Sequence, residues 1–384
     1  MVKMKYNKIA VQEVDAMSNH ILYKGEIDFK AEPLFLGTGR NVSRLELNLE
    51  QGIQKQTDAA VGKMWFKNDF GYLEDAKDYG AMDDKLRTLY LKNFKFQTLG
   101  DSAASRTVAE VFLPITTNPQ LESWWFQHAF FENNIHSATY AEIIKVMPLE
   151  TNKVFDDIMI NPQILSRVTE ITDVFEETVI YNAVRLLSKS GNVNIAYDLD
   201  EHKRLIAKSL YALNILEFML FKSSFITSFA FKEKGLMTAT GDAIKKILLD
   251  ELGHGAMTTN LINRLRVDPE WAAAFNDVKA EATEMYHKAI RADHKWAEYL
   301  CEDNVVLIGI SESILKQYTN YNAINVTRAI GIDLGLPKTF NPCVWADKYT
   351  KSSNIQTAQK EKSNGNYLLG KLDMNVTPGF WESL

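Results

Sequence analysis

Hydrophobic residues recur at helical spacing through most of the chain, whereas the alternation typical of strands is scarce. No proline occurs between Pro162 and Pro269, so long uninterrupted helices are possible there. The pattern shows neither an internal repeat nor an interdomain linker. It predicts an all-α bundle of long antiparallel helices. The expected helices cover about residues 43–56, 83–100, 119–146, 162–188, 198–231, 241–266 and 269–303, with a last pair that ends near residue 335.

The pattern changes at both ends of the chain. Residues 1–32 are mixed in character and are interpreted as an N-terminal arm, which leaves 33–348 as the helical domain. Residues 349–384 begin with a polar run, YTKSSNIQTAQKEKSNGN, that is typical of a flexible tether. The run is followed by an apolar end carrying Phe380 and Trp381, which favours a peptide that docks to a partner protein. The alternative is an ordinary C-terminus that packs on its own domain.

Composition narrows the class of protein. The chain has 384 residues, 46% of them hydrophobic, which is enough for a sizeable core. A net charge of −6 argues against a nucleic-acid-binding surface. Two cysteines, Cys301 and Cys343, form no disulfide framework, and no segment is long and apolar enough for a signal peptide or a membrane span. We therefore expect a soluble cytoplasmic protein.

The stretch IKKILLDELGHGAMTTN contains the first candidate metal-binding pair, because Glu251 and His254 lie three residues apart on a predicted helix. A carboxylate and an imidazole at that spacing share one helix face and can bind the same ion. The spacing also occurs by chance in helices that bind nothing. Here the surrounding turn is apolar, and a buried carboxylate needs a partner.

Further candidates lie on other predicted helices. Glu132, His136 and Tyr140 follow one another at intervals of four, on one helix face. Glu217, in LNILEFMLF, has no basic neighbour within one turn, and Asp101 also lies in apolar surroundings. Four carboxylates and two histidines in a helical bundle match a di-iron or di-manganese carboxylate centre, since four negative ligands neutralise two divalent ions.

Several longer segments, taken together with these residues, resemble the small, radical-bearing subunit of class I ribonucleotide reductase. The matching segments occur in family order over about residues 60–384: FKFQTLGDSAASR, LESWWFQHAFFENNIHSATY, LEFMLFKSSFITSFAF, LLDELGH, NPCVW and NYLLGKLD. The resemblance implies a ferritin-like fold, a homodimer, a di-iron centre (with manganese possible), and a large subunit to which the C-terminal tail docks. The implied metal ligands are Asp101, Glu132, His136, Glu217, Glu251 and His254.

The same resemblance implies roles for residues around the metals. Tyr140 would carry the radical that the metal centre generates with dioxygen. Trp65 and Asp250 would form, with His136, a hydrogen-bonded path for electron transfer, and Tyr367 would relay the radical to the large subunit, which makes deoxyribonucleotides. The apolar pocket around the radical would be formed by Phe221, Phe225 and Ile247.

The sequence departs from the family pattern at the first Glu-x-x-His pair. Glu132 and His136 are four apart, and Asn133 stands three residues before His136. In one alignment, Asn133 replaces the ligand. In the other, Glu132 remains the ligand and one residue is inserted as a π-bulge, which is favoured because such bulges are frequent at functional sites. A milder departure is Leu249, which replaces a residue that is often basic in the family.

Two other functions compete with this reading. A ferritin-like oxidase or oxygenase would act on its own substrate, but it would not need Trp65, Tyr140, Tyr367 and an anchoring tail together. An iron-storage protein would be a shorter chain assembled as a shell. Manganese-containing, mixed-metal and metal-free versions of the same subunit remain open at this stage.

Overall fold

The fold is described from a computed structural model, which describes residues 20–350 except 192–193 and 306. Tyr367, Phe380, Trp381 and residues 1–19 of the predicted arm lie outside the described residues. The chain divides into two compact units, Met1–Ala346 and Asp347–Leu384, and the described part of the second unit is α15 (Asp347–Thr350). In the part of the chain that is described, no helix is both long and apolar enough to cross a membrane.

The first unit is built from α-helices, and among its described residues the only β-structure is two isolated bridges. Short 3₁₀ turns are η1 (Leu45–Leu47), η2 (Lys67–Asp69), η4 (Leu113–Ile115) and η7 (Val344–Ala346), and π-helical segments are η3 (Val108–Phe112), η5 (Phe131–Ser137) and η6 (Leu216–Leu220). The α-helices are α2 (Gln51–Val61), α3 (Leu73–Ala81), α4 (Asp84–Thr107), α5 (Pro119–Phe130), α6 (Ala138–Val146), α7 (Thr151–Ile158), α8 (Pro162–Ser190), α9 (Leu199–Ile215), α10 (Phe221–Glu233), α11 (Thr238–Leu265), α12 (Ala272–Asp277), α13 (Lys279–Cys301) and α14 (Glu312–Ala329).

Local chemistry explains where the long helices begin. The side chains of Asp83, Asn118, Asn161 and Asp198 accept hydrogen bonds from backbone N–H groups in the first turns of α4, α5, α8 and α9. These caps satisfy donors that have no partner inside a helix. In α5 and α8 the cap is followed by a proline, whose missing N–H costs nothing at a first helical position.

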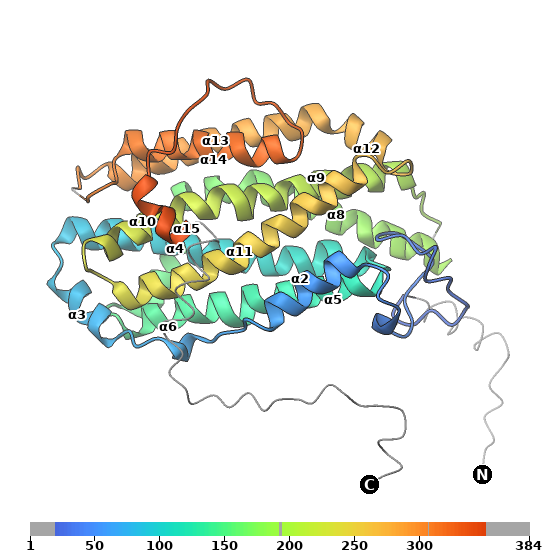
Figure 1. Ribbon diagram of the computed structural model, residues 1–384, viewed down its shortest axis with the longest axis horizontal. Helices are drawn as coiled ribbons and strands as arrows, with labels where there is room; N and C mark the ends of the chain where they lie inside the picture. Colours follow the sequence, from blue (N-terminus) through green and yellow to red (C-terminus); the bar gives the residue numbers. More distant parts are fainter. Residues whose placement is uncertain (1–19, 192–193, 306, 351–384) are drawn as a thin grey trace, which may run out of the picture. The chain divides into compact units, whose positions relative to one another are not determined.

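The long helices pack side by side and leave the predicted site between them. Helix α9 lies between α8 and α11, α5 packs against α2, and α4 packs against η5 and α10 (Figure 1). Helix α13 packs against α8 and α9, and α14 packs against α13 and η6. This arrangement confirms the predicted all-α bundle and brings α4, η5, η6 and α11 together, the four segments that carry the candidate metal ligands.

Three predicted boundaries are wrong, for local reasons. The helix predicted to end near residue 100 continues to Thr107, so that Asp101 lies inside α4. The helix predicted over 269–303 is two helices, α12 and α13. The predicted last pair is the single helix α14, because Gly331 and Gly335 adopt left-handed backbone conformations with φ of 76° and 62° and two prolines follow.

The first predicted helix also starts later than expected. Its first turn is the 3₁₀ segment η1, Asn48 has a φ of 47°, and the α-helix begins only at Gln51. Trp65 lies in the loop between α2 and η2, where it is 3% exposed.

Candidate metal centre

Two of the π-helical segments position buried carboxylates. Glu132 lies in η5 and Glu217 in η6, and both side chains are fully buried. A π-turn accommodates one residue more than an α-turn. Within this π-helical segment Glu132 and His136, four residues apart, are both buried, while Asn133 and Asn134 are exposed. This is the geometry of the alignment with an inserted residue, whereas the exposed Asn133 does not fit the alignment in which it replaces a ligand.

One cluster of potential ligands consists of Asp101, Glu132, His136 and Glu251. Each residue offers one donor atom, and these atoms all lie within 4.8 Å of one another. Nδ1 of His136 is 3.5 Å from Oε2 of Glu132 and 3.3 Å from Oε1 of Glu251. Three carboxylates and one imidazole thus surround a common space between α4, η5 and α11.

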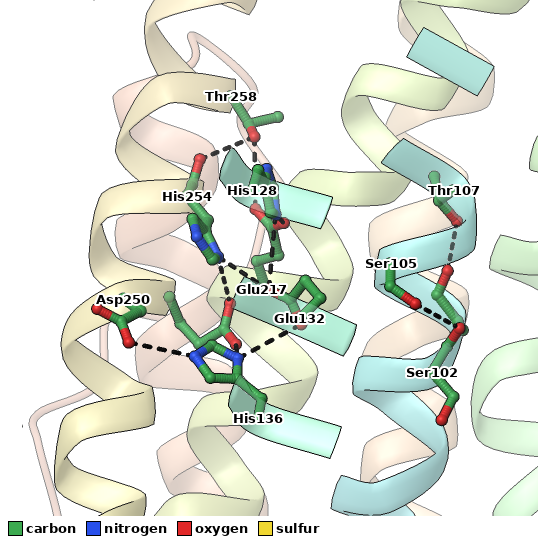
Figure 2. A network of polar contacts seen from close by, with 12 residues as sticks. Ser102, Ser105, Thr107, His128, Glu132, His136, Glu217, Asp250, His254 and Thr258 are labelled. Carbon is green, nitrogen blue, oxygen red and sulfur yellow. Dashed lines mark hydrogen bonds and ion pairs between the residues drawn. The ribbon is translucent and has the colours of Figure 1, made fainter. Parts of the chain in front are cut away.

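A second cluster adjoins the first and consists of His128, Glu132, Glu217 and His254, again with donor atoms within 4.8 Å of one another. Nδ1 of His254 is 2.9 Å from Oε1 of Glu132, and Nε2 of His128 is 2.8 Å from Oε1 of Glu217 (Figure 2). This group contains two imidazoles and two carboxylates.

Two carboxylates connect the clusters. Glu132 belongs to both, with one oxygen near His136 and the other near His254. Glu251 is placed in the same way, because its Oε1 is near His136 and its Oε2 is 3.2 Å from Nδ1 of His254. Carboxylates that face two sites at once are suited to bridging two ions.

Unpartnered atoms show that the cluster fits metal ions. Both oxygens of Asp101 and of Glu132, Oε1 of Glu217, Oε1 of Glu251 and Nδ1 of His136 are buried without a hydrogen-bond partner. Buried polar atoms in proteins are rarely left without a hydrogen-bond partner. Burial and then the nearby Glu132 carboxylate raise the pKa of Asp101 well above its usual value, and burial raises the pKa of Glu217. Two divalent cations would satisfy these atoms and neutralise the four negative charges.

A hydrogen-bonded chain leads from the clusters toward the surface of the bundle. Nε2 of His136 lies 3.2 Å from Oδ2 of Asp250, and the same oxygen accepts a hydrogen bond of 2.7 Å from Nε1 of Trp65. The Trp65 ring stacks on the His136 ring, with centroids 6.1 Å apart. The three residues expected to form a path are therefore in contact.

Tyr140 is fully buried beside the first cluster, and its hydroxyl has no hydrogen-bond partner. Burial, followed by the Asp101 and Glu251 carboxylates, raises its pKa well above 10, so the phenol keeps its proton at neutral pH. The rings of Phe94 and Tyr140 pack edge to face, with centroids 5.2 Å apart. The predicted pocket residues Phe221, Phe225 and Ile247 are also completely buried, and the two phenylalanine rings stack.

His128 is the residue that the sequence analysis missed. It lies four residues before Glu132, the same interval that directed attention to His136, so a signal was present. The surrounding run WWFQHAFF is so apolar and aromatic that a core position was the simpler interpretation.

A helical bundle with two adjoining buried carboxylate–histidine clusters defines a ferritin-like dimetal carboxylate protein. The sequence matches the family model "Ribonucleotide reductase, small chain" over residues 50–342. The chain therefore belongs to the ribonucleotide reductase small-chain family, as the sequence motifs indicated, and it is the radical-generating small subunit of such an enzyme.

A curated relative agrees with this assignment, and solved structures share the fold. The chain is 32% identical over 353 residues to ribonucleoside-diphosphate reductase 1 subunit beta of Escherichia coli O157:H7, covering 90% of this chain and 93% of that protein. The R2 subunit from Clostridium botulinum has the same fold, with a TM-score of 0.70 and 21% identity over 83% of this chain and 94% of that one. A dimanganese(II) NrdF from Streptococcus sanguinis matches with a TM-score of 0.61 and 17% identity, over 76% and 93% of the two chains.

Proposed function

We propose that this chain generates a tyrosyl radical at Tyr140 and delivers it to a large catalytic subunit that reduces ribonucleoside diphosphates to deoxyribonucleotides. The observation that carries the proposal is the position of a buried, protonated tyrosine beside two joined metal-ligand clusters. The similarity to the subunit beta of Escherichia coli supports the substrate class.

The residues that would hold two metal ions are Asp101, Glu132, His136, Glu217, Glu251 and His254. Carboxylate oxygen and imidazole nitrogen suit iron and manganese, and we favour iron with manganese as the alternative. When bound, the two ions supply, together with dioxygen, the oxidising power that removes one electron from a tyrosine.

The surrounding side chains would control the proton and the water at Tyr140. A tyrosine that loses an electron also releases its hydroxyl proton, and the nearby Asp101 could accept it on the carboxylate oxygen that does not bind a metal ion. Phe221, Phe225 and Ile247 are fully buried and offer only apolar side chains, and as the pocket around Tyr140 they would help to keep water from the radical.

Electrons would leave or enter along the contacts from His136 through Asp250 to Trp65. We further propose that the protein is a homodimer, that Tyr367 continues the path, and that the C-terminal FWESL segment anchors the large subunit.

A chain lacking residues 368–384 should keep its radical but fail to bind the large subunit. An unchanged affinity in a pull-down would contradict this role of the tail.

The central experiment is an electron paramagnetic resonance spectrum of metal-free protein after anaerobic ferrous loading and exposure to air. We expect a tyrosyl doublet that Tyr140→Phe removes without loss of metal. Tyr90→Phe is the matched control, because Tyr90 is also buried and stacks on the same Phe94 ring. A doublet of unchanged shape in Tyr140→Phe would refute the assignment.

A further inference from the structure

We propose that His128 is a seventh ligand of the metal centre, binding through Nε2 the ion that Glu217 and His254 also hold. The inference rests on the proposed dimetal centre and makes its two sites chemically different. One site would have a single imidazole, from His136, and the other would have two.

The position of His128 carries the first part of the argument. It lies in the last turn of α5 and is fully buried. Its Nε2 is 2.8 Å from Oε1 of Glu217 and 3.6 Å from Oε1 of Glu132, and its ring stacks on that of His254 with centroids 3.7 Å apart (Figure 2). The nitrogen therefore faces the same space as the donor atoms of three expected ligands.

The missing partners of His128 carry the second part. Neither ring nitrogen has a hydrogen bond, because the short contact with Glu217 lacks hydrogen-bond geometry and Oε1 of Glu217 is itself unpartnered. His202 shows how a buried histidine of this chain is otherwise satisfied. Its Nδ1 is 3.0 Å from the hydroxyl of Tyr197, and its Nε2 is 2.8 Å from Oδ1 of Asn182.

An unpaired buried nitrogen is unfavourable, so a partner for Nε2 of His128 is expected. Nδ1 of His136, which faces the first cluster, is unpartnered in the same way. A metal ion bound between Nε2 of His128 and Oε1 of Glu217 would satisfy both atoms at once. It would also explain why a nitrogen and an oxygen approach closely without forming a hydrogen bond.

The extra imidazole has a consequence for metal selection. Affinity for nitrogen-containing sites rises from manganese to iron to cobalt, and carboxylate-rich sites suit manganese better than imidazole-rich ones do. The site with His128 and His254 should therefore discriminate more strongly against manganese than the site with three carboxylates. In a mixture of ferrous and manganous ions, iron should enter the His128 site first.

The decisive experiment is a crystal structure of the wild-type chain loaded anaerobically with manganous ion alone, with the ions located by anomalous scattering. We expect Nε2 of His128 at bonding distance, about 2 Å, from one ion. A separation above about 3 Å, with Nε2 hydrogen-bonded to Glu217, would overturn the inference by making His128 a positioning residue.

Binding isotherms for manganous and ferrous ions provide the solution test. His128→Phe keeps a ring to stack on His254 but cannot bind a metal, and His202→Gln is the control for a buried histidine outside the centre. We expect His128→Phe to weaken one of the two equivalents at least about 100-fold for iron, and less for manganese, while His202→Gln keeps both affinities.

The outcomes separate this inference from the proposed function. If the wild type binds two ions and His128→Phe binds both with wild-type affinity, only the role of His128 is wrong. If the wild type itself binds no metal, the dimetal centre and the radical function fail together.

Discussion

The most informative single substitution is Glu132→Gln, because Glu132 faces both metal sites. Its two oxygens lie 3.5 Å from Nδ1 of His136 and 2.9 Å from Nδ1 of His254. The amide has nearly the same shape, but it removes the negative charge and leaves only one oxygen that can bind an ion. We expect both ions to be bound more weakly, whereas replacing a carboxylate of one cluster alone should affect mainly one ion.

The size of the effect follows from the separation of the charges. Two unit charges about 4 Å apart interact by roughly 4 kcal/mol at an effective dielectric constant of about 20. A divalent ion doubles this energy, and the remaining amide oxygen together with relaxation of the site recovers part of it. A net loss of about 4 kcal/mol for each ion corresponds to a decrease in affinity of roughly 1,000-fold.

The assay is anaerobic titration of metal-free protein with ferrous ion, followed by desalting and measurement of the iron retained. The wild type should retain two equivalents and Glu132→Gln close to none. Asn133→Ala is the matched control, because its exposed side chain lies one residue away and points out of the bundle. It should behave as the wild type.

A double variant, Glu132→Gln with Asn133→Glu, tests the reasoning most severely. It restores the Glu-x-x-His spacing and the total charge, but the new carboxylate should project into solvent on the exposed side of η5. Recovery of two tightly bound ions would show that residue 133 can reach the centre. The π-helical geometry would then not decide which residue binds.

Three further substitutions test the surroundings of the site. Asp250→Ala removes the acceptor shared by two buried donors and should lower the free energy of unfolding by about 2–5 kcal/mol in urea; an unchanged midpoint would contradict this. Burial lowers the pKa of Lys222 from 10.5 to about 8. Between these pH values the Lys222 amine is protonated in the unfolded chain and largely neutral in the folded one. The free energy of unfolding should therefore rise with pH there, by at most about 1.4 kcal/mol per pH unit. Lys222→Met should abolish that rise, and parallel pH profiles of stability in the two proteins would refute the lowered pKa of Lys222. In Gly100→Ala the new methyl would overlap Cε1 of Phe221, so we expect the free energy of unfolding to fall by about 1–3 kcal/mol in thermal denaturation, whereas Gly80→Ala, with open space around it, should not destabilise the protein.

Local chemistry made most of the helices predictable. Periodic apolar residues with Asp83, Asn118 or Asn161 before them specify where a helix starts, and these signals act within one or two turns. The errors in the predicted helix boundaries occurred where the apolar periodicity was weak or where residues that end helices opposed it. The last pair of helices was expected to extend to about residue 335, but α14 ends at Ala329, and Gly331 and Gly335 beyond it adopt left-handed backbone conformations.

The candidate site was predictable to the extent that its residues lie on one helix at fixed spacing. The pair Glu251 and His254, and the inward positions of Glu132 and His136, follow from helical periodicity and the exclusion of charge from apolar surroundings. The roles assigned to Tyr140 and to the pocket around it came from family resemblance and stay predictions.

The sequence by itself determined the helical class, the set of inward carboxylates and the family, because each depends on spacing along the chain. Only the tertiary structure decided how these residues combine. Glu132 bridges two clusters because η5 packs against α4 while the Glu132 side chain also reaches His254 of α11. His128 becomes a candidate ligand only because Glu217 and His254, from two other elements, approach its ring without satisfying it. Whether a buried nitrogen has a partner depends on side chains distant in sequence, and no periodicity within one helix contains that information.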